Sequence, residues 1–170
     1  LIDRSTASTT ALYNARELAW DQEILTFIGI TEDMLPPVIS TTESRPLTAE
    51  AAERMHLPVG LPVVIGATDG VLVNVGIGAV SAGQLSATIG TSGAVRMLVG
   101  EPRVDEKMRT WCYNLVDDLW VTGGAINNGG MILRWMRDKI CHFSKEQMAA
   151  LDVDAYDLMT MKASKVAAGS

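Results

Sequence analysis

The sequence predicts a mixed α/β fold built from two consecutive parts. The first observation is the stretch at residues 63–79, where the apolar run VVIGA, typical of a buried strand, is followed by a glycine-containing turn and a helix with Asp69 at its first position. The second is a change of pattern after Gly83, where two strand pairs in succession give way to a helix. The third is the apolar content of 48% over 170 residues, which suffices for a packed core.

In the first part, local signals predict short helices separated by turns. Residues 11–20 favour a helix or a turn, and Asp21 can cap a helix that Gly29 ends. Thr31 is the expected cap of a short helix before the proline pair of LPPV, and Thr48 is the expected cap of a helix in TAEAAERMHL. The run VVIGA then predicts a strand inside a sheet.

In the second part, the chain predicts hairpins before helices. QLSATIG and AVRMLVG form an expected hairpin closed by TSG, and TWCYNLV and LWVTGG form another across Asp117 and Asp118. The next helix is expected to open within GGAINNGG, with an apolar face formed by Ile132, Leu133, Met136 and Ile140. Ser144 and Asp154 are the expected caps of two further helices.

The change of pattern predicts a domain boundary between Ile77 and Gln84, which divides the chain into residues 1–79 and 80–170. The chain begins with Leu and ends directly after a helical pattern, so we expect it to be a piece of a longer protein.

Composition and charge argue against several classes of partner. The net charge is −6 and Lys and Arg do not cluster, so a broad nucleic-acid surface is not expected. Residues 61–80 are long enough to span a bilayer, but they carry Pro62, Asp69 and Asn74, so a buried core segment is the better interpretation. The polar start of the chain does not have the pattern of a signal peptide, and a cytoplasmic location is expected.

The cysteines and histidines do not predict a metal site. Cys112 and Cys141 form no CxxC pair and are expected to be buried or partly buried thiols in a reducing compartment. His56 and His142 lie far apart in the sequence without ligand-like partners.

Asp69 stands within an otherwise apolar run, GATDGVLVNVGIG, and two interpretations remain open. It can cap a helix, as aspartates before apolar helices commonly do. It can also be a base in a cleft, because a helix start stabilises a carboxylate that accepts a hydroxyl proton.

Two glycine-rich stretches also leave alternatives open. In TIGTSGAVR, Gly90 and Gly93 let the main chain approach a ligand, and the turn can bind an anion through its N–H groups, but an ordinary tight turn fits the same residues. In GGAINNGG, residues 123–130, the glycines predict close approach by a ligand or by another segment of backbone.

Taken together and in order, GATDG, TIGTSGAVR and GGAINNGGMILRWMRD resemble the FGGY family of carbohydrate kinases. STAS near the start, with WDQEIL and GITEDMLPPV behind it, resembles the stretch that precedes the family's catalytic aspartate. The likeness covers nearly the whole chain, and within the family the bacterial gluconate kinases resemble it most.

The resemblance implies an α/β fold of two ribonuclease-H-like domains, as in actin and hexokinase, that close over a cleft. Residues 1–79 would be the C-terminal part of the family's N-terminal domain, and residues 80–170 the N-terminal part of its C-terminal domain. The resemblance implies that Asp69 takes the proton of the attacking sugar hydroxyl and that Gly70 helps to shape the sugar site. The implied nucleotide-binding residues are Gly90, Thr91 and Ser92 in the phosphate-binding turn, with Gly130 and Arg134 at the head of the following helix.

The implied reaction is ATP-dependent phosphorylation of a sugar or sugar acid, most like D-gluconate to 6-phosphogluconate, with ATP and Mg²⁺ required. A kinase for another polyol or sugar, such as xylulose or glycerol, and a nucleotide- or sugar-binding piece without catalysis remain alternatives. The expected partners are the sugar and ATP, with neither nucleic acid nor membrane, and a homodimer is left open. The family's N-terminal phosphate loop and later adenosine segment are missing from this sequence, so the piece alone is expected to be inactive.

Overall fold

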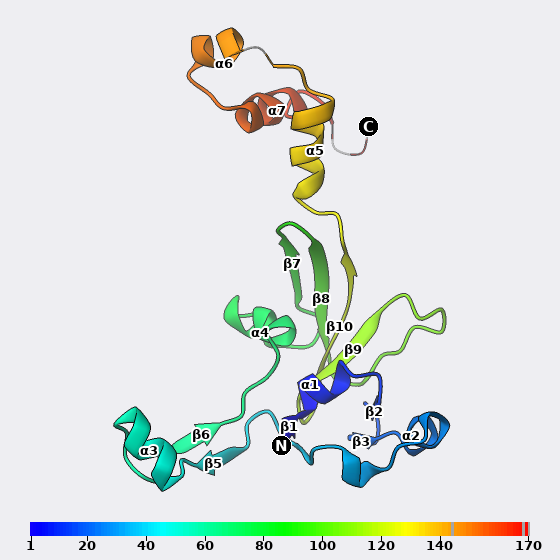
Figure 1. The fold of residues 1–170 in the computed structure, drawn as a ribbon. Helices are drawn as coiled ribbons and strands as arrows, with labels where there is room; N and C mark the ends of the chain where they lie inside the picture. Colours follow the sequence, from blue (N-terminus) through cyan, green and yellow to red (C-terminus); the bar gives the residue numbers. More distant parts are fainter. Residues whose placement is uncertain (144, 168, 170) are drawn as a thin grey trace. The chain divides into compact units, whose positions relative to one another are not determined.

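The computed structural model describes residues 1–143, 145–167 and 169. The chain forms two compact units, one of residues 1–87 and 95–124 and one of residues 88–94 and 125–170. Figure 1 shows the elements of both units along the chain.

The helices are short. They are α1 (Arg4–Ser8), α2 (Gln22–Ile28), the 3₁₀ helix η1 (Glu32–Met34), α3 (Ala49–Met55), α4 (Asp69–Gly76), α5 (Met131–Lys139), α6 (Lys145–Leu151) and α7 (Ala155–Ala163).

The strands form one larger sheet and three pairs. The pairs are β1 (Ile2–Asp3) with β4 (Val38–Ile39), β2 (Tyr13–Asn14) with β3 (Ala19–Trp20), and β5 (Ser44–Pro46) with β6 (Pro62–Val64). The larger sheet has the order β7-β8-β10-β9, made of β7 (Leu85–Ile89), β8 (Gly93–Val99), β10 (Leu119–Ile126) and β9 (Trp111–Val116). The first pair is parallel, whereas β9 and β10 are antiparallel with a register shift between Leu119 and Trp120.

One apolar cluster of the first unit includes residues 11–20, for which a helix or a turn was predicted. The turn is confirmed at residues 15–18, where it connects β2 and β3 in a hairpin with Tyr13 opposite Trp20, whereas the helix alternative is wrong. Both side chains are buried with Ala7 and Leu25, and the two rings meet edge to face with centroids 6.0 Å apart. Burial of this aromatic pair across the two strands favours the hairpin over a helix, because such pairs contribute beyond their buried area.

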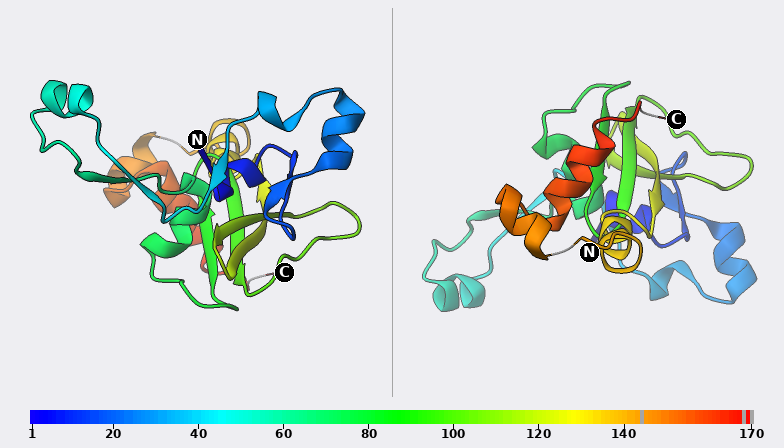
Figure 2. Two further views of the ribbon diagram at one scale, coloured as in Figure 1. Left: turned by 90° about the horizontal axis from the view of Figure 1, so that it is seen from below. Right: turned by 90° about the horizontal axis from the view of Figure 1, so that it is seen from above.

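The second cluster of the first unit joins α4 to the larger sheet. Val71 of α4 packs with Leu98, Leu115 and Val121 from β8, β9 and β10. α1 lies against β9 in the views of Figures 1 and 2. α4, which begins at Asp69, therefore packs its buried face against the larger sheet.

Three predicted helix starts are confirmed. The side chains of Asp21, Thr48 and Asp154 accept hydrogen bonds from backbone N–H groups in the first turns of α2, α3 and α7, and Gly29 ends α2 in the left-handed conformation. Thr31 is the cap residue of η1, as predicted, but its side chain forms no capping hydrogen bond. The predicted cap Ser144 lies outside the described residues.

The strand predicted from VVIGA is present but is not inside a sheet. β6 pairs only with β5 in a two-stranded antiparallel sheet, and Val63 and Val64 are 47% and 57% exposed. A short apolar run indicates the strand conformation but not the layers that cover it, so the prediction of burial was wrong. Among the described residues, no helix combines the length and the apolar character needed to cross a bilayer.

The helix after the hairpins begins later than predicted. Gly123 and Gly124 belong to β10, and α5 begins at Met131. The predicted apolar face of α5 is largely uncovered in this chain, since Ile132, Leu133 and Ile140 are 42%, 52% and 53% exposed.

Candidate functional site

Asp69 is the first residue of α4, as predicted, but it does not cap the helix. Thr68 is the cap: its Oγ1 accepts a hydrogen bond from the N–H of Gly70 at 3.1 Å and donates to Asp69 Oδ1 at 3.4 Å. Asp69 is exposed. Its carboxylate therefore stands at the start of the helix and remains accessible to a group that approaches from solution.

Gly70, next to Asp69, is not required by packing. A Cβ at this position would meet Thr68 Oγ1 at 3.5 Å, an ordinary contact, and no other atom of the described residues lies within 4 Å. The side of Gly70 is therefore open to a ligand.

The turn between β7 and β8 is held directly against the start of α5. The N–H of Gly129 donates to the carbonyl of Thr91 at 2.8 Å, and the N–H of Gly130 donates to the carbonyl of Gly90 at 2.6 Å. A Cβ on Gly129 would lie 2.4 Å from the carbonyl oxygen of Ser92, and one on Gly130 would lie 2.8 Å from that of Gly90. The close approach predicted for this glycine pair is thus the approach of another backbone segment.

The glycines of the turn differ in their surroundings. Around Gly90, no described residue other than its two chain neighbours has an atom within 4 Å of an added Cβ. A Cβ on Gly93 would meet the Ile126 side chain at 3.1 Å, so Gly93 is needed for packing within the chain and not, as expected, for approach to a ligand. Of the two glycines, only Gly90 is accessible to a ligand.

A pocket of about 560 Å³ lies over this junction and gathers four of the predicted nucleotide-binding residues: Gly90, Thr91, Gly130 and Arg134. Ser92 does not line it; the Ser92 carbonyl accepts a hydrogen bond from the N–H of Gly90 at 2.8 Å within the turn. Asp69 and Gly70 belong to the first compact unit, whereas the pocket belongs entirely to the second.

Charged side chains on α5 border the pocket. Arg134 is 74% exposed and its Nε lies 3.8 Å from Asp138 Oδ2, while Arg137 Nε donates to Asp138 Oδ1 at 2.7 Å. The hydrogen bond from Arg137 lowers the pKa of Asp138, so this carboxylate stays ionised. Because the Arg134–Asp138 contact is long and exposed, it costs little to exchange it for a phosphate oxygen.

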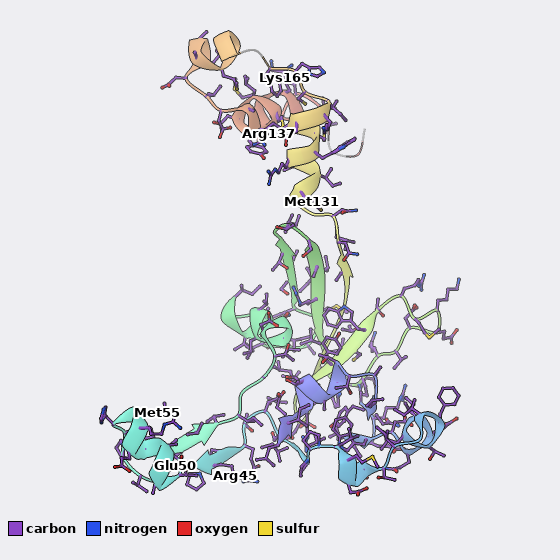
Figure 3. The ribbon with its side chains drawn as sticks, in the orientation of Figure 1. Arg45, Glu50, Met55, Met131, Arg137 and Lys165 are labelled. Carbon is purple, nitrogen blue, oxygen red and sulfur yellow. The ribbon has the colours of Figure 1, made fainter. Side chains whose placement is uncertain are left out.

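Sequence reasoning missed five residues that line the same pocket: Met131, Trp135, Asp138, Lys139 and Tyr156. Four of them lie on α5 at spacings that place them beside Arg134, so helical periodicity could have found them. Tyr156 lies on α7, where the Arg137 guanidinium is 5.0 Å from its ring centroid, and no local signal links it to the site. Figure 3 labels Met131 at the start of α5 and Arg137 toward its end, beside α7.

A second pocket, of about 410 Å³, lies between α5 and α7 and is lined mostly by apolar groups, including Leu133, Met136 and Phe143. It holds none of the predicted site residues.

Comparison with known proteins supports the motifs found in the sequence. Residues 1–76 match the FGGY family of carbohydrate kinases, N-terminal domain. The chain is 44% identical over 171 aligned residues to the gluconokinase of Bacillus subtilis (strain 168), covering 100% of this chain and 33% of that protein. The resemblance to the FGGY carbohydrate kinases is confirmed.

The structure agrees with this FGGY relationship. It matches the crystal structure of gluconate kinase from Lactobacillus acidophilus with a TM-score of 0.83 and 28% identity, over 99% of this chain and 32% of that one. A ligand-bound xylulose kinase from the same organism matches with a TM-score of 0.82 and 28% identity, over the same shares of the two chains. The predicted fold class is therefore confirmed: the chain has the mixed α/β fold of part of the two-domain, actin-like sugar kinases.

The FGGY match ends at the last residue of α4, so it includes Asp69 and Gly70. The chain spans about a third of the length of the curated relatives that it matches, at 33% for each of the two gluconokinases.

Proposed function

We propose that this chain is the central part of an ATP-dependent gluconate kinase. The observation that carries the proposal is the pocket at the junction of the β7–β8 turn and α5, where Gly90, Thr91, Gly130 and Arg134 come together. The N–H groups of Gly90 and Gly130 already donate to carbonyls within this junction. The phosphates would therefore be bound by the Thr91 hydroxyl and by the Arg134 guanidinium. The exposed 3.8 Å contact of Arg134 with Asp138 can be exchanged for a phosphate oxygen at little cost. The pocket is therefore suited to the phosphates of a nucleotide.

In the proposed reaction, the Asp69 carboxylate accepts the proton of a sugar hydroxyl while the hydroxyl oxygen attacks the γ-phosphorus of ATP. The bond from that phosphorus to the β–γ bridging oxygen breaks, and ADP leaves. Gly70 gives the sugar access to this carboxylate. The Gly90–Ser92 turn, with Gly130 and Arg134, holds the nucleotide. Catalysis of this kind depends on positioning and on charge stabilisation more than on covalent chemistry.

Phosphoryl transfer from ATP ordinarily requires Mg²⁺, which binds through the substrate's phosphates and only one or two carboxylates. The described residues hold no group of three or more His, Cys, Asp or Glu side chains that could bind a metal ion by themselves. We propose that Mg²⁺ would bind mainly through the phosphates of ATP and would neutralise their charge.

We further propose that the domain boundary lies between residues 79 and 80. The end of the FGGY N-terminal match at residue 76 supports this position. The two compact units of this chain divide differently, because α4 packs against β8, β9 and β10 and α1 packs against β9. Asp69 and the β7–β8 turn would then belong to different domains, and closure of these domains would exclude water from the transfer. The proposed location is the cytoplasm, where ATP is available.

Gluconate is preferred as the substrate because of the 44% identity to a gluconokinase. Xylulose is the second candidate, because the solved xylulose kinase and gluconate kinase match this chain at the same identity of 28%.

The test is an ADP-release assay on a full-length kinase that carries this sequence, with gluconate, xylulose and glycerol as acceptors. We expect the highest kcat/KM with gluconate. A higher kcat/KM with xylulose or glycerol would change the assigned substrate but not the assigned reaction. Binding of ATP without turnover of any acceptor would favour the non-catalytic alternative.

A further inference from the structure

The start of α4 is attached to α1 by a buried network of hydrogen bonds. The N–H of Thr68 donates to Ser5 Oγ at 2.8 Å, across 63 positions of sequence. The Ser5 hydroxyl in turn donates to the Asp3 carboxylate. Ser5 is fully buried and Asp3 is 7% exposed.

Each group in this network has a defined role. Asp3 Oδ1 also accepts from the N–H of Thr6 at 3.0 Å, so the carboxylate caps α1 and is fixed in place. Because a carboxylate can only accept, the Ser5 hydroxyl must point its hydrogen at Asp3 and present a lone pair to Thr68. The Ser5 hydroxyl therefore has one possible orientation, because no other orientation satisfies Asp3, Ser5 and Thr68 together.

The bond to Ser5 satisfies a group that the helix cannot satisfy. The N–H of a cap residue has no partner inside its own helix, and Thr68 is the cap of α4. With its side chain bonded to Gly70 and its main chain bonded to Ser5, Thr68 is held from both sides.

Asp69 itself is held only loosely by its side chain. Among the described residues, its carboxylate has one side-chain bond, the 3.4 Å contact with Thr68 Oγ1. The position of this exposed carboxylate is therefore set by the main chain at residues 68 and 69, which is where the Ser5 bond acts.

α1 is fixed on the sheet by other residues. Ser8 Oγ accepts from the N–H of Asn114 on β9 at 3.2 Å, and Arg4 forms an ion pair with Asp117 beyond the end of β9. Ser5 then connects α1, which is fixed on the sheet, to the start of α4 through its hydrogen bond with Thr68.

We propose that Ser5 is a positioning residue for Asp69, which holds the catalytic carboxylate at a fixed place through the main-chain N–H of Thr68. The inference rests on the proposed function, because it assumes that Asp69 acts as the base. Displacement of a catalytic group by about 1 Å can lower a rate about 10²-fold, so loss of this bond acts on turnover more than on substrate binding.

The experiment compares Ser5→Ala, Ser5→Cys, Ser8→Ala and Asp69→Asn in the full-length kinase, with gluconate and ATP. Ser5→Cys keeps nearly the same side-chain size but replaces the hydroxyl by a poor acceptor, so it serves where Ser5→Ala fails to fold. Ser8→Ala is the matched control, since Ser8 lies on the same helix and bonds to the sheet instead of to Thr68. The ion pair of Arg4 with Asp117 still anchors α1 in this variant.

We expect both Ser5 variants to lower kcat at least about tenfold while the KM values for gluconate and ATP stay within about twofold. Ser8→Ala should retain kcat within about twofold. Amide hydrogen exchange, followed at residue 68, should be faster in both Ser5 variants and unchanged in Ser8→Ala.

Wild-type kcat in a folded Ser5 variant would overturn the inference, and so would an equal loss of kcat in Ser8→Ala. These results differ from failure of the proposed function, in which the wild type does not phosphorylate a sugar or Asp69→Asn retains normal turnover.

Discussion

Asp69 is exposed and is the first residue of a helix. Both features suit the proposed base, which must contact an incoming hydroxyl. Thr68 takes the capping role, so the Asp69 carboxylate is not committed to the N–H groups of its own helix. Sequence reasoning treated capping and catalysis as roles that one residue could share. The structure gives the capping bond to Thr68, and Asp69 remains the proposed base.

Replacement of Asp69 by Asn should remove the proton acceptor and leave the size of the side chain unchanged. In the full-length kinase we expect kcat to fall by about 10²–10⁴-fold with little change in the KM for ATP. Asp118→Asn, at an exposed turn residue, is the control and should keep normal turnover. Steady-state kinetics with gluconate measure both, and near-normal kcat in Asp69→Asn would contradict the assigned role.

Tyr13 provides a prediction about stability that is independent of catalysis. Its side chain is 9% exposed, and its hydroxyl has no hydrogen-bond partner among the described residues. Burial raises the pKa of Tyr13 from 10.0 to about 12, with the nearby Arg4 charge opposing the shift. The neutral phenol is therefore favoured in the folded state.

The sign of the pH dependence follows from this shift. Between pH 10.0 and about 12 the unfolded chain loses the Tyr13 proton while the folded chain keeps it, so stability falls as the pH rises through this window. The loss attributable to Tyr13 is about 1–3 kcal/mol.

Tyr13→Phe should remove that part of the alkaline loss and change stability little at neutral pH, because an unpaired buried hydroxyl contributes no bond. Urea unfolding of both proteins, at neutral pH and at about pH 11, measures the difference. An identical alkaline loss in the two proteins would show that Tyr13 is not responsible.

At the scale of elements, the glycine pair before α5 explains how the β7–β8 turn is placed. The two N–H···O bonds from Gly129 and Gly130 join the turn to the helix start, and the absence of side chains permits this approach. The pocket that contains Thr91 and Arg134 exists because these two elements meet.

Gly129→Ala should therefore separate the turn from α5. The added Cβ would lie 2.4 Å from the Ser92 carbonyl oxygen, which forces the backbone to move. We expect ATP affinity to fall at least about tenfold and the melting temperature to drop, since overpacking of this kind costs about 1–3 kcal/mol.

Gly124→Ala is the matched control, because a Cβ there meets no atom within 4 Å in the part of the chain that the structure describes, apart from the two adjacent residues. Calorimetric titration of the full-length variants with MgATP measures the affinities. Equal affinity of Gly129→Ala and wild type would mean that the junction does not form the nucleotide site.

At the scale of the whole molecule, the chain contains both the proposed base and the proposed nucleotide-binding residues. It spans only about a third of the length of its curated relatives. Several apolar side chains stand exposed in both units, among them Val63, Ile89 and Trp135. The family resemblance places a further phosphate loop and an adenosine segment outside this sequence.

Residues 1–170 expressed alone should consequently show no gluconate-dependent release of ADP, whereas the full-length kinase should. Circular dichroism of the short chain would establish that it is folded in the same buffer. Turnover by the short chain would mean that residues 1–170 are sufficient for the reaction.

The sequence by itself determined the local elements and the family motifs. Caps at Asp21, Thr48 and Asp154, and the two hairpins, depend on hydrogen bonds and side-chain patterns between neighbouring residues, which the order of residues specifies directly. The resemblance to the FGGY kinases implied Gly90, Thr91, Gly130 and Arg134 as nucleotide-binding residues, and these four residues line one pocket.

Only the tertiary structure decided which distant groups meet. The hairpin of Tyr13 and Trp20, the exposure of β6, the contribution of Tyr156 to the pocket, and the bond from Thr68 to Ser5 all depend on packing between segments. Local propensities are differences of about 1 kcal/mol or less per residue, and burial of a side chain exceeds them. For that reason the residues that could do chemistry were visible in the sequence, whereas the residues that hold them in place were not.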